Sequence, residues 1–210
     1  MIYLPQILVV IGLLIPALAS ATGDAESVKA LYIPCVACHG ADGEGNAELL
    51  APGLAGQSES YLMRQLWDFK KGKRGAAPGD SAGAQMLPMV ATLADGIAIA
   101  DVAAYLASLP VQVPPATVEG DAANGKEQYI SKCGVCHGGD AWGNEALFTP
   151  RLTIVGDSYL LRQINNFQTG VRGAHKEAKL GQQMKAMSLL VSDEEINDIV
   201  AYLNELATQE

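Results

Sequence analysis

Cysteine and histidine are both scarce in this chain of 210 residues, which contains four cysteines and three histidines. The cysteines form two pairs, Cys35 with Cys38 and Cys133 with Cys136, and a histidine directly follows each pair. No further cysteine remains to complete a zinc site around either pair. Two disulfides would be possible in an exported chain, but they would not explain the histidine that follows each pair.

Positive charge is also in short supply, since 14 Lys and Arg residues face 23 Asp and Glu residues and the net charge is −9. This balance argues against nucleic acid as a partner, because binding to phosphates relies on Lys and Arg. It favours protein partners that dock through a basic or an apolar patch, because complementary charge speeds encounter. An acidic surface that serves only solubility is the alternative.

No Lys or Arg precedes the apolar run from Ile7 to Leu18 near the start of the chain. The small residues that follow suit signal peptidase, so we expect cleavage after Ala19 or Ala21 and export of the rest. An uncleaved membrane anchor is the alternative, because the first 18 residues nearly reach the roughly 20 apolar residues of a spanning helix.

What the chain does contain is the pattern Cys-x-x-Cys-His, twice, at Cys35–His39 and at Cys133–His137. This spacing is the attachment site of a c-type haem. The two thiols bond to the haem, and the adjacent imidazole, His39 or His137, ligates the iron. The sequence therefore predicts two covalently bound haem c groups.

The two motifs belong to a longer internal repeat with an offset of 98 residues, which falls to 97 near the C-terminus. Identical residues at this offset include Gly40/Gly138, Pro52/Pro150, Tyr61/Tyr159, Arg64/Arg162, Gln65/Gln163, Arg74/Arg172, Met86/Met184 and Met89/Met187. The repeat predicts two tandem domains, with boundaries at 1–21 (signal peptide or N-terminal anchor), 22–113 and 114–210. The segment Pro110–Pro115 reads as a stiff linker between them.

Apolar residues at helical spacing and the absence of convincing strands predict an all-α fold. The expected helices are Asp24–Cys38, Ser58–Lys71, Ile97–Leu109, Gly120–Cys136, Ser158–Gln168 and Asp193–Ala207. The stretches 39–57 and 72–87 are rich in Gly and Pro or Ala and are expected to be loops. Ser192 and Glu195 have the spacing of a capping box at the start of the last helix.

The shortage of histidine limits how each iron can be ligated. Only His175 is left over, and it falls opposite Ala77 in the repeat, so it is expected to be a surface loop residue and not a ligand. Methionine is the remaining soft donor, and two of the repeated pairs are Met86/Met184 and Met89/Met187. Both pairs are expected in a loop before the last helix, and their spacing alone does not choose between them. The pair that does not ligate would pack in the core.

The motifs, the Tyr-Leu-x-x-Gln helices, the methionine segments and the Ala-Tyr-Leu final helices together resemble the dihaem cytochrome c4 family. Each half is similar to a class I cytochrome c. The resemblance implies that Met86 and Met184 are the second iron ligands. It also implies that the carbonyls of Pro52 and Pro150 accept a hydrogen bond from the motif histidines.

The same resemblance places Arg74 and Arg172 near the haem propionates, with a solvated surface charge as the alternative. Tyr61 and Tyr159 are expected to serve helix packing. Ala94 departs from the second half, where Ser192 stands, so Asp95 is expected to cap the last helix of the first domain.

Haem attachment outside the cytoplasm then implies a periplasmic protein, with membrane association through the N-terminal segment as a further possibility.

An iron that carries both an imidazole and a thioether leaves no open position for a substrate. The sequence therefore predicts an electron carrier and not an enzyme. It would transfer single electrons between a quinol-oxidising complex or dehydrogenase and a terminal oxidase or reductase. The alternatives are a fixed subunit of a membrane complex and a dihaem peroxidase, which would need one open iron.

Overall fold

The computed structural model describes residues 25–209, and these residues form two helical units joined by a linker. The first unit contains α1 (Ala25–His39), α2 (Glu59–Lys70), α3 (Ser81–Ala91) and α4 (Gly96–Ser108). The second contains α5 (Ala122–Lys132), α6 (Gly134–His137), the short 3₁₀ helix η1 (Glu145–Leu147), α7 (Asp157–Thr169), α8 (Lys179–Ser188) and α9 (Asp193–Ala207). Within 25–209 the only β pairing consists of two isolated bridges, so the all-α prediction is confirmed.

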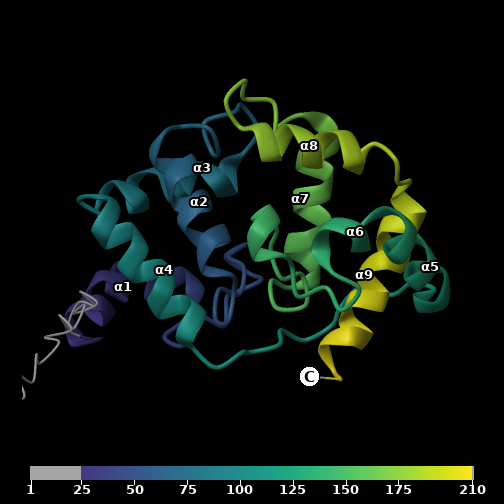
Figure 1. Cartoon of the computed structure of the whole chain (residues 1–210), viewed down its shortest axis with the longest axis horizontal. Helices are drawn as coiled ribbons and strands as arrows, with labels where there is room; N and C mark the ends of the chain where they lie inside the picture. The colour runs from purple at the N-terminus through teal and green to yellow at the C-terminus, as the bar shows by residue number, and fades with distance from the viewer. Residues whose placement is uncertain (1–24, 210) are drawn as a thin grey trace, which may run out of the picture.

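The two units lie side by side, with α2 and α7 facing each other at the centre of the molecule (Figure 1). Most of the expected helices are present with ends displaced by one or two residues, and the last one is found at its expected bounds. The expected linker, 110–115, lies in a stretch without helix or strand that includes the expected domain boundary at Val113. The expected signal peptide, 1–21, lies outside the described residues.

Predictions about three helices are wrong: loops were expected at α3 and α8, and a continuous motif helix was expected in the second unit. Residues 81–91 form α3 where the sequence indicated a loop through Leu87, because Asp80 caps the helix by accepting from the Gly83 amide at 2.9 Å. The alanines, which the loop prediction counted as loop residues, and Gln85 are good helix formers, and they outweigh the glycine and the proline within α3.

The haem-motif helix of the second unit is interrupted at Cys133, although one helix over 120–136 was expected. The reason is one additional residue. Tyr32 lies three positions before Cys35, whereas its structural counterpart Tyr129 lies four positions before Cys133. Both tyrosines nevertheless donate to the same loop carbonyl, at Gly40 (2.8 Å) and Gly138 (2.7 Å). A break in the helix accommodates the additional residue while keeping this hydrogen bond.

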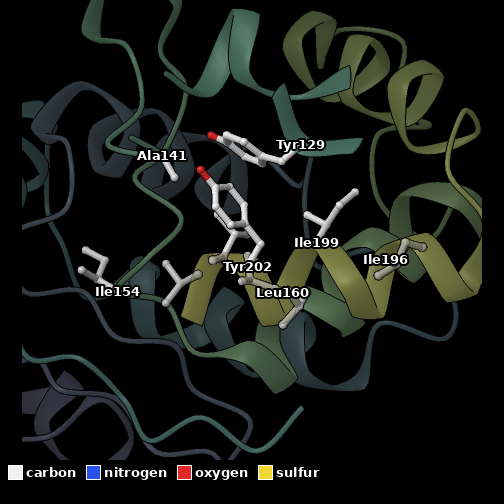
Figure 2. Packing of buried hydrophobic residues seen from close by; sticks show 10 residues of the cluster. Tyr129, Ala141, Ile154, Leu160, Ile196, Ile199 and Tyr202 are labelled. Carbon is white, nitrogen blue, oxygen red and sulfur yellow. The ribbon is translucent and has the colours of Figure 1, made fainter. Parts of the chain in front are cut away.

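Each unit has its own apolar core, built where its first and last helices cross. Tyr32 packs on Tyr105 and Tyr129 on Tyr202, both with ring centroids 5.7 Å apart and tilted planes. Figure 2 shows the second pair among Ile199, Leu160 and their neighbours. Such tilted aromatic pairs stabilise a core beyond the area they bury. They also position the motif helix, because Tyr32 and Tyr129 lie on it.

The linker is held against the second unit by Asp157, at the start of α7. Its carboxylate accepts from the amides of Thr117 and Val118 and from the Thr117 hydroxyl. Burial raises the pKa of Asp157, but these hydrogen bonds lower it more, so the net shift is downward. No single helix between residues 25 and 209 is long and apolar enough to cross a membrane; α3 and α4 together could be, but they meet at a bend of 118°.

The helix caps provide a direct test of the fold. Ser192 and Glu195 form the expected capping box, and Asp95 caps α4 through the amides of Ile97 and Ala98, also as expected. We predict that Ser192→Ala lowers the free energy of unfolding by about 1 kcal/mol, because an amide at the start of α9 loses its acceptor. Chemical denaturation measures this loss. Ala94→Ser, at the equivalent position of the first unit, should change little because Asp95 already caps α4, and an equal effect of both substitutions would contradict the assignment.

Candidate haem sites

The two Cys-x-x-Cys-His motifs lie at helix ends, each at the wall of a cavity. Cys35, Cys38 and His39 line the first cavity at the end of α1. Cys133, Cys136 and His137, at α6, line the second cavity. None of the four cysteines is joined in a disulfide. Burial raises the pKa of the Cys35 thiol, and it raises the pKa of Cys133 to about 11, so both are protonated at neutral pH.

Both motif histidines are buried and hydrogen-bonded as the resemblance implied. His39 Nδ1 lies 3.0 Å from the Pro52 carbonyl oxygen, and His137 Nδ1 lies 3.3 Å from that of Pro150. Burial lowers the pKa of both imidazoles, more than the prolyl hydrogen bonds raise it, and Arg74 lowers that of His39 further. A neutral imidazole that donates from Nδ1 keeps Nε2 as a free acceptor, which is the form that ligates a metal.

The four repeated methionines all line the cavities, Met86 and Met89 the first, Met184 and Met187 the second. They lie on α3 and α8, so the flexible methionine loops expected from the sequence are in fact helices. Met187 is 38% exposed, whereas Met184 is less so. His175 lines neither cavity; its ring accepts from the Glu177 amide.

The cavities are apolar and share one wall. Their volumes are about 140 Å³ and about 490 Å³, and the second lies within the usual range for a bound organic ligand. Six residues line both cavities: Tyr61, Gln65, Arg74, Val155, Tyr159 and Gln163. A single layer of side chains from α2, α7 and their flanking loops therefore separates the two sites.

Arg74 belongs to this wall, and Arg172, which lines the second cavity, is hydrogen-bonded to it. Arg74 donates to Gln65 of its own unit (2.7 Å) and to Tyr159 of the other (2.8 Å). Arg172 repeats the arrangement, donating to Gln163 (2.8 Å) and, across the interface, to Gln65 (2.7 Å) and more weakly to Tyr61 (3.4 Å).

Tyr61 and Tyr159 thus also accept hydrogen bonds from arginines of the opposite unit, which the sequence pattern did not reveal. Burial alone would raise the pKa of Tyr61, but the guanidinium groups of Arg172 and Arg74 lower it to about 8. This environment exists only where the two units pack together. In the sequence, both the arginines and the tyrosines look like ordinary surface residues.

Several buried donors in the wall have no acceptor among residues 25–209. These are Nε of Arg64, Arg74 and Arg162, and Nε2 of Gln65, all in side chains that line a cavity. Buried donors without partners are costly, so they indicate a ligand that brings acceptors. A haem, which carries two carboxylates on an otherwise apolar ring, meets this requirement, together with the paired thiols and the neutral imidazole.

Comparison with known proteins agrees with this chemistry. The cytochrome c family matches twice in tandem, over residues 25–110 and 122–207. Cytochrome c4 of Pseudomonas aeruginosa is 32% identical over 97% of this chain and 98% of its own length. This chain belongs to the dihaem cytochrome c4 family. Like its relatives, it is an electron carrier that holds two haem c groups and is not an enzyme.

Further relatives support the assignment to the cytochrome c4 family. The crystal structure of reduced recombinant cytochrome c4 from Pseudomonas stutzeri superimposes with a TM-score of 0.68 at 28% identity, covering 86% of this chain and 97% of that one. A thiosulfate dehydrogenase electron acceptor of Stutzerimonas stutzeri is 32% identical over 84% of this chain and 80% of its own length. The superposition agrees with the two-unit architecture described above.

The repeat is broken at one buried contact between the units. The Gln57 side chain pairs with the backbone of Arg151, donating to its carbonyl (2.9 Å) and accepting from its amide (2.8 Å). The equivalents, Val155 and Gly53, cannot form this pair. Gly53 is needed there for space, because a Cβ would lie 2.2 Å from the Ile154 carbonyl oxygen.

We predict that Gln57→Ala destabilises the contact between the units by about 1–3 kcal/mol, because it removes both hydrogen bonds of a buried side chain across the interface. Thermal unfolding of the haem-loaded protein measures the loss. Gln209→Ala, at an exposed position that lines neither cavity, is the control. A Gln57 variant as stable as this control would show that the pair contributes nothing.

Proposed function

We propose that this cytochrome carries single electrons in the periplasm, from a quinol-oxidising complex or a dehydrogenase to a terminal oxidase or reductase. The observation that carries the proposal is the common lining of the two cavities, each of which also presents an imidazole and methionine thioethers. When bound, each haem supplies an iron that gains or loses one electron. Two such sites, separated by one layer of side chains, suit a short relay.

The residue roles in this proposal follow the two repeats. Cys35, Cys38, Cys133 and Cys136 would hold the haems covalently. His39 and His137 would provide one iron ligand, and Met86 and Met184 the other; the fuller exposure of Met187 supports Met184 over it. Pro52 and Pro150 would orient the imidazoles. Arg74 and Arg172 would offer hydrogen bonds to the propionates, which the unpaired Arg74 Nε supports.

The domain boundaries proposed for this function are 1–21, 22–113 and 114–210, with removal of the first segment on export. The linker residues around Val113 lie between the two stretches matched by the family, which supports this division. A dehydrogenase as the donor is supported by the relative named as an electron acceptor of thiosulfate dehydrogenase.

The ligand assignment is tested by replacing each methionine with alanine. We predict that Met86→Ala and Met184→Ala each abolish half of the sulfur-to-iron absorption band at the red end of the oxidised spectrum and lower the potential of that haem, because the thioether stabilises reduced iron. Met89→Ala and Met187→Ala are the matched controls in the same helices. Loss of the band in the controls would move the ligand to the other pair.

Location and partnership are tested together by cell fractionation. We predict that osmotic shock releases a haem-loaded protein that lacks its first 19 or 21 residues, and that this pool is reoxidised by membranes containing a terminal oxidase. Recovery only in the membrane fraction, in a constant ratio to a dehydrogenase or oxidase, would instead identify a fixed subunit of that complex.

A further inference from the structure

Two arginines reach across the interface in opposite directions through their Nη2 atoms, which are distinct from the unpaired Nε atoms described above. Arg64, on α2, donates from Nη2 to the Phe148 carbonyl oxygen of the second unit at 3.0 Å. Arg162, on α7, donates from Nη2 to the Leu50 carbonyl oxygen of the first unit at 2.6 Å. Arg64 and Arg162 are equivalent in the repeat, as are Leu50 and Phe148, so the contact is made twice.

The carbonyls that accept these bonds belong to two equivalent turns, residues 46–51 and 144–149. Each turn is closed by an isolated bridge between its first and last residues. Leu50 and Phe148 have φ angles of 59° and 55°, in the left-handed region, which is strained for a residue with a side chain. Their amides donate within the turn, to Ala47 and Glu145. The arginine of the other unit holds the carbonyl of the strained residue.

Each turn forms part of the wall of its own haem cavity. Leu49 and Leu50 line the first cavity, and Leu147 and Phe148 line the second, although all four are between 42% and 49% exposed. These side chains therefore stand between the cavity and solvent.

The arginines are themselves held firmly enough to position a turn. Arg64 stacks over the Tyr61 ring at 5.2 Å and lies 3.5 Å from the Asp68 carboxylate. Arg162 stacks over the Tyr159 ring at 5.3 Å, while Asn166 occupies the position that corresponds to Asp68. Tyr61 and Tyr159 are in turn bonded to the arginines of the shared wall, so both contacts are anchored at the centre of the interface.

We propose that Arg64 and Arg162 are crossed positioning residues: each holds the turn that shields the haem of the other unit, and thereby sets that haem's reduction potential. A loosened turn admits water, which stabilises the more highly charged oxidised centre and lowers the potential. The imidazole bonds should change little, because separate bonds hold the residue before each proline. Ala51 pairs twice with Asn46, and the Thr149 hydroxyl donates to Cys136.

The test uses the full haem-loaded protein and two conservative variants, Arg64→Lys and Arg162→Lys, which keep the charge but lose the guanidinium geometry. An NMR-monitored redox titration follows both sites separately through the amide signals of Gly40 and Gly138. Arg64→Lys should lower only the potential of the second site, and Arg162→Lys only that of the first. We expect about a threefold change in the electron-transfer equilibrium, which corresponds to about 30 mV.

Arg64→Met and Arg162→Met distinguish positioning from charge. If the arginines act only through their charge, the lysine variants will match the unmodified protein and only the methionine variants will shift, and the proposal is wrong. It is equally overturned if each lysine variant shifts the haem of its own unit, or both haems alike.

Hydrogen exchange provides a second measurement that does not depend on the iron ligands. The Phe148 amide should exchange about tenfold faster in Arg64→Lys, and the Leu50 amide in Arg162→Lys, with the other turn unchanged. The proposal rests on haem binding as proposed above, but the two fail differently. If the ligand assignment is wrong, the absorption band will be lost in the Met89 or Met187 variant. If amide exchange is unchanged in both turns, only the proposed arginine contacts are wrong.

Discussion

Half-buried guanidinium groups between α2 and α7 impose the constraint on which the molecule depends. A buried charge must find acceptors, or burying it is too costly. Arg74 and Arg172 find them in the glutamines and tyrosines of both units, and Arg64 and Arg162 in backbone carbonyls of the opposite unit. These directional bonds fix how the units face each other. The two cavities consequently come to share a wall.

The shared wall is part of both haem sites and of the interface between the units. Because the same side chains line both cavities, a side chain that moves in one cavity also changes the lining of the other. The remaining unpaired donors in it suit the carboxylates of two haems. Binding the haems would thus complete the same hydrogen-bond system that holds the units together, and the stability of the interface and the properties of the redox sites cannot be separated.

The repeat is close, but the two sites are not equivalent. Gln57 binds the backbone of Arg151 at a position where the other unit has valine and glycine. The motif helix is continuous in the first unit and interrupted at Cys133 in the second. Asp68 supports Arg64, whereas Arg162 has asparagine at that place. Two haems in such different surroundings have a physical basis for different potentials.

Sequence reasoning succeeded where the information is local. The motif spacing predicts haem attachment, Ser192 and Glu195 predict the start of α9, and Asp95 predicts the cap of α4, because each depends on residues within a few positions of one another. It failed at α3, where helix-forming residues outweighed a proline and a glycine, and at Cys133, where one additional residue broke a helix.

The sequence by itself determined the chemistry of this protein: two thiol pairs, two imidazoles and two methionine pairs, repeated in order along the chain. Only the tertiary structure decided what surrounds that chemistry. Arg64 and Phe148 are 84 residues apart, and Arg162 and Leu50 are 112 apart. No local pattern relates such residues, because their contact exists only once the two units have packed against each other.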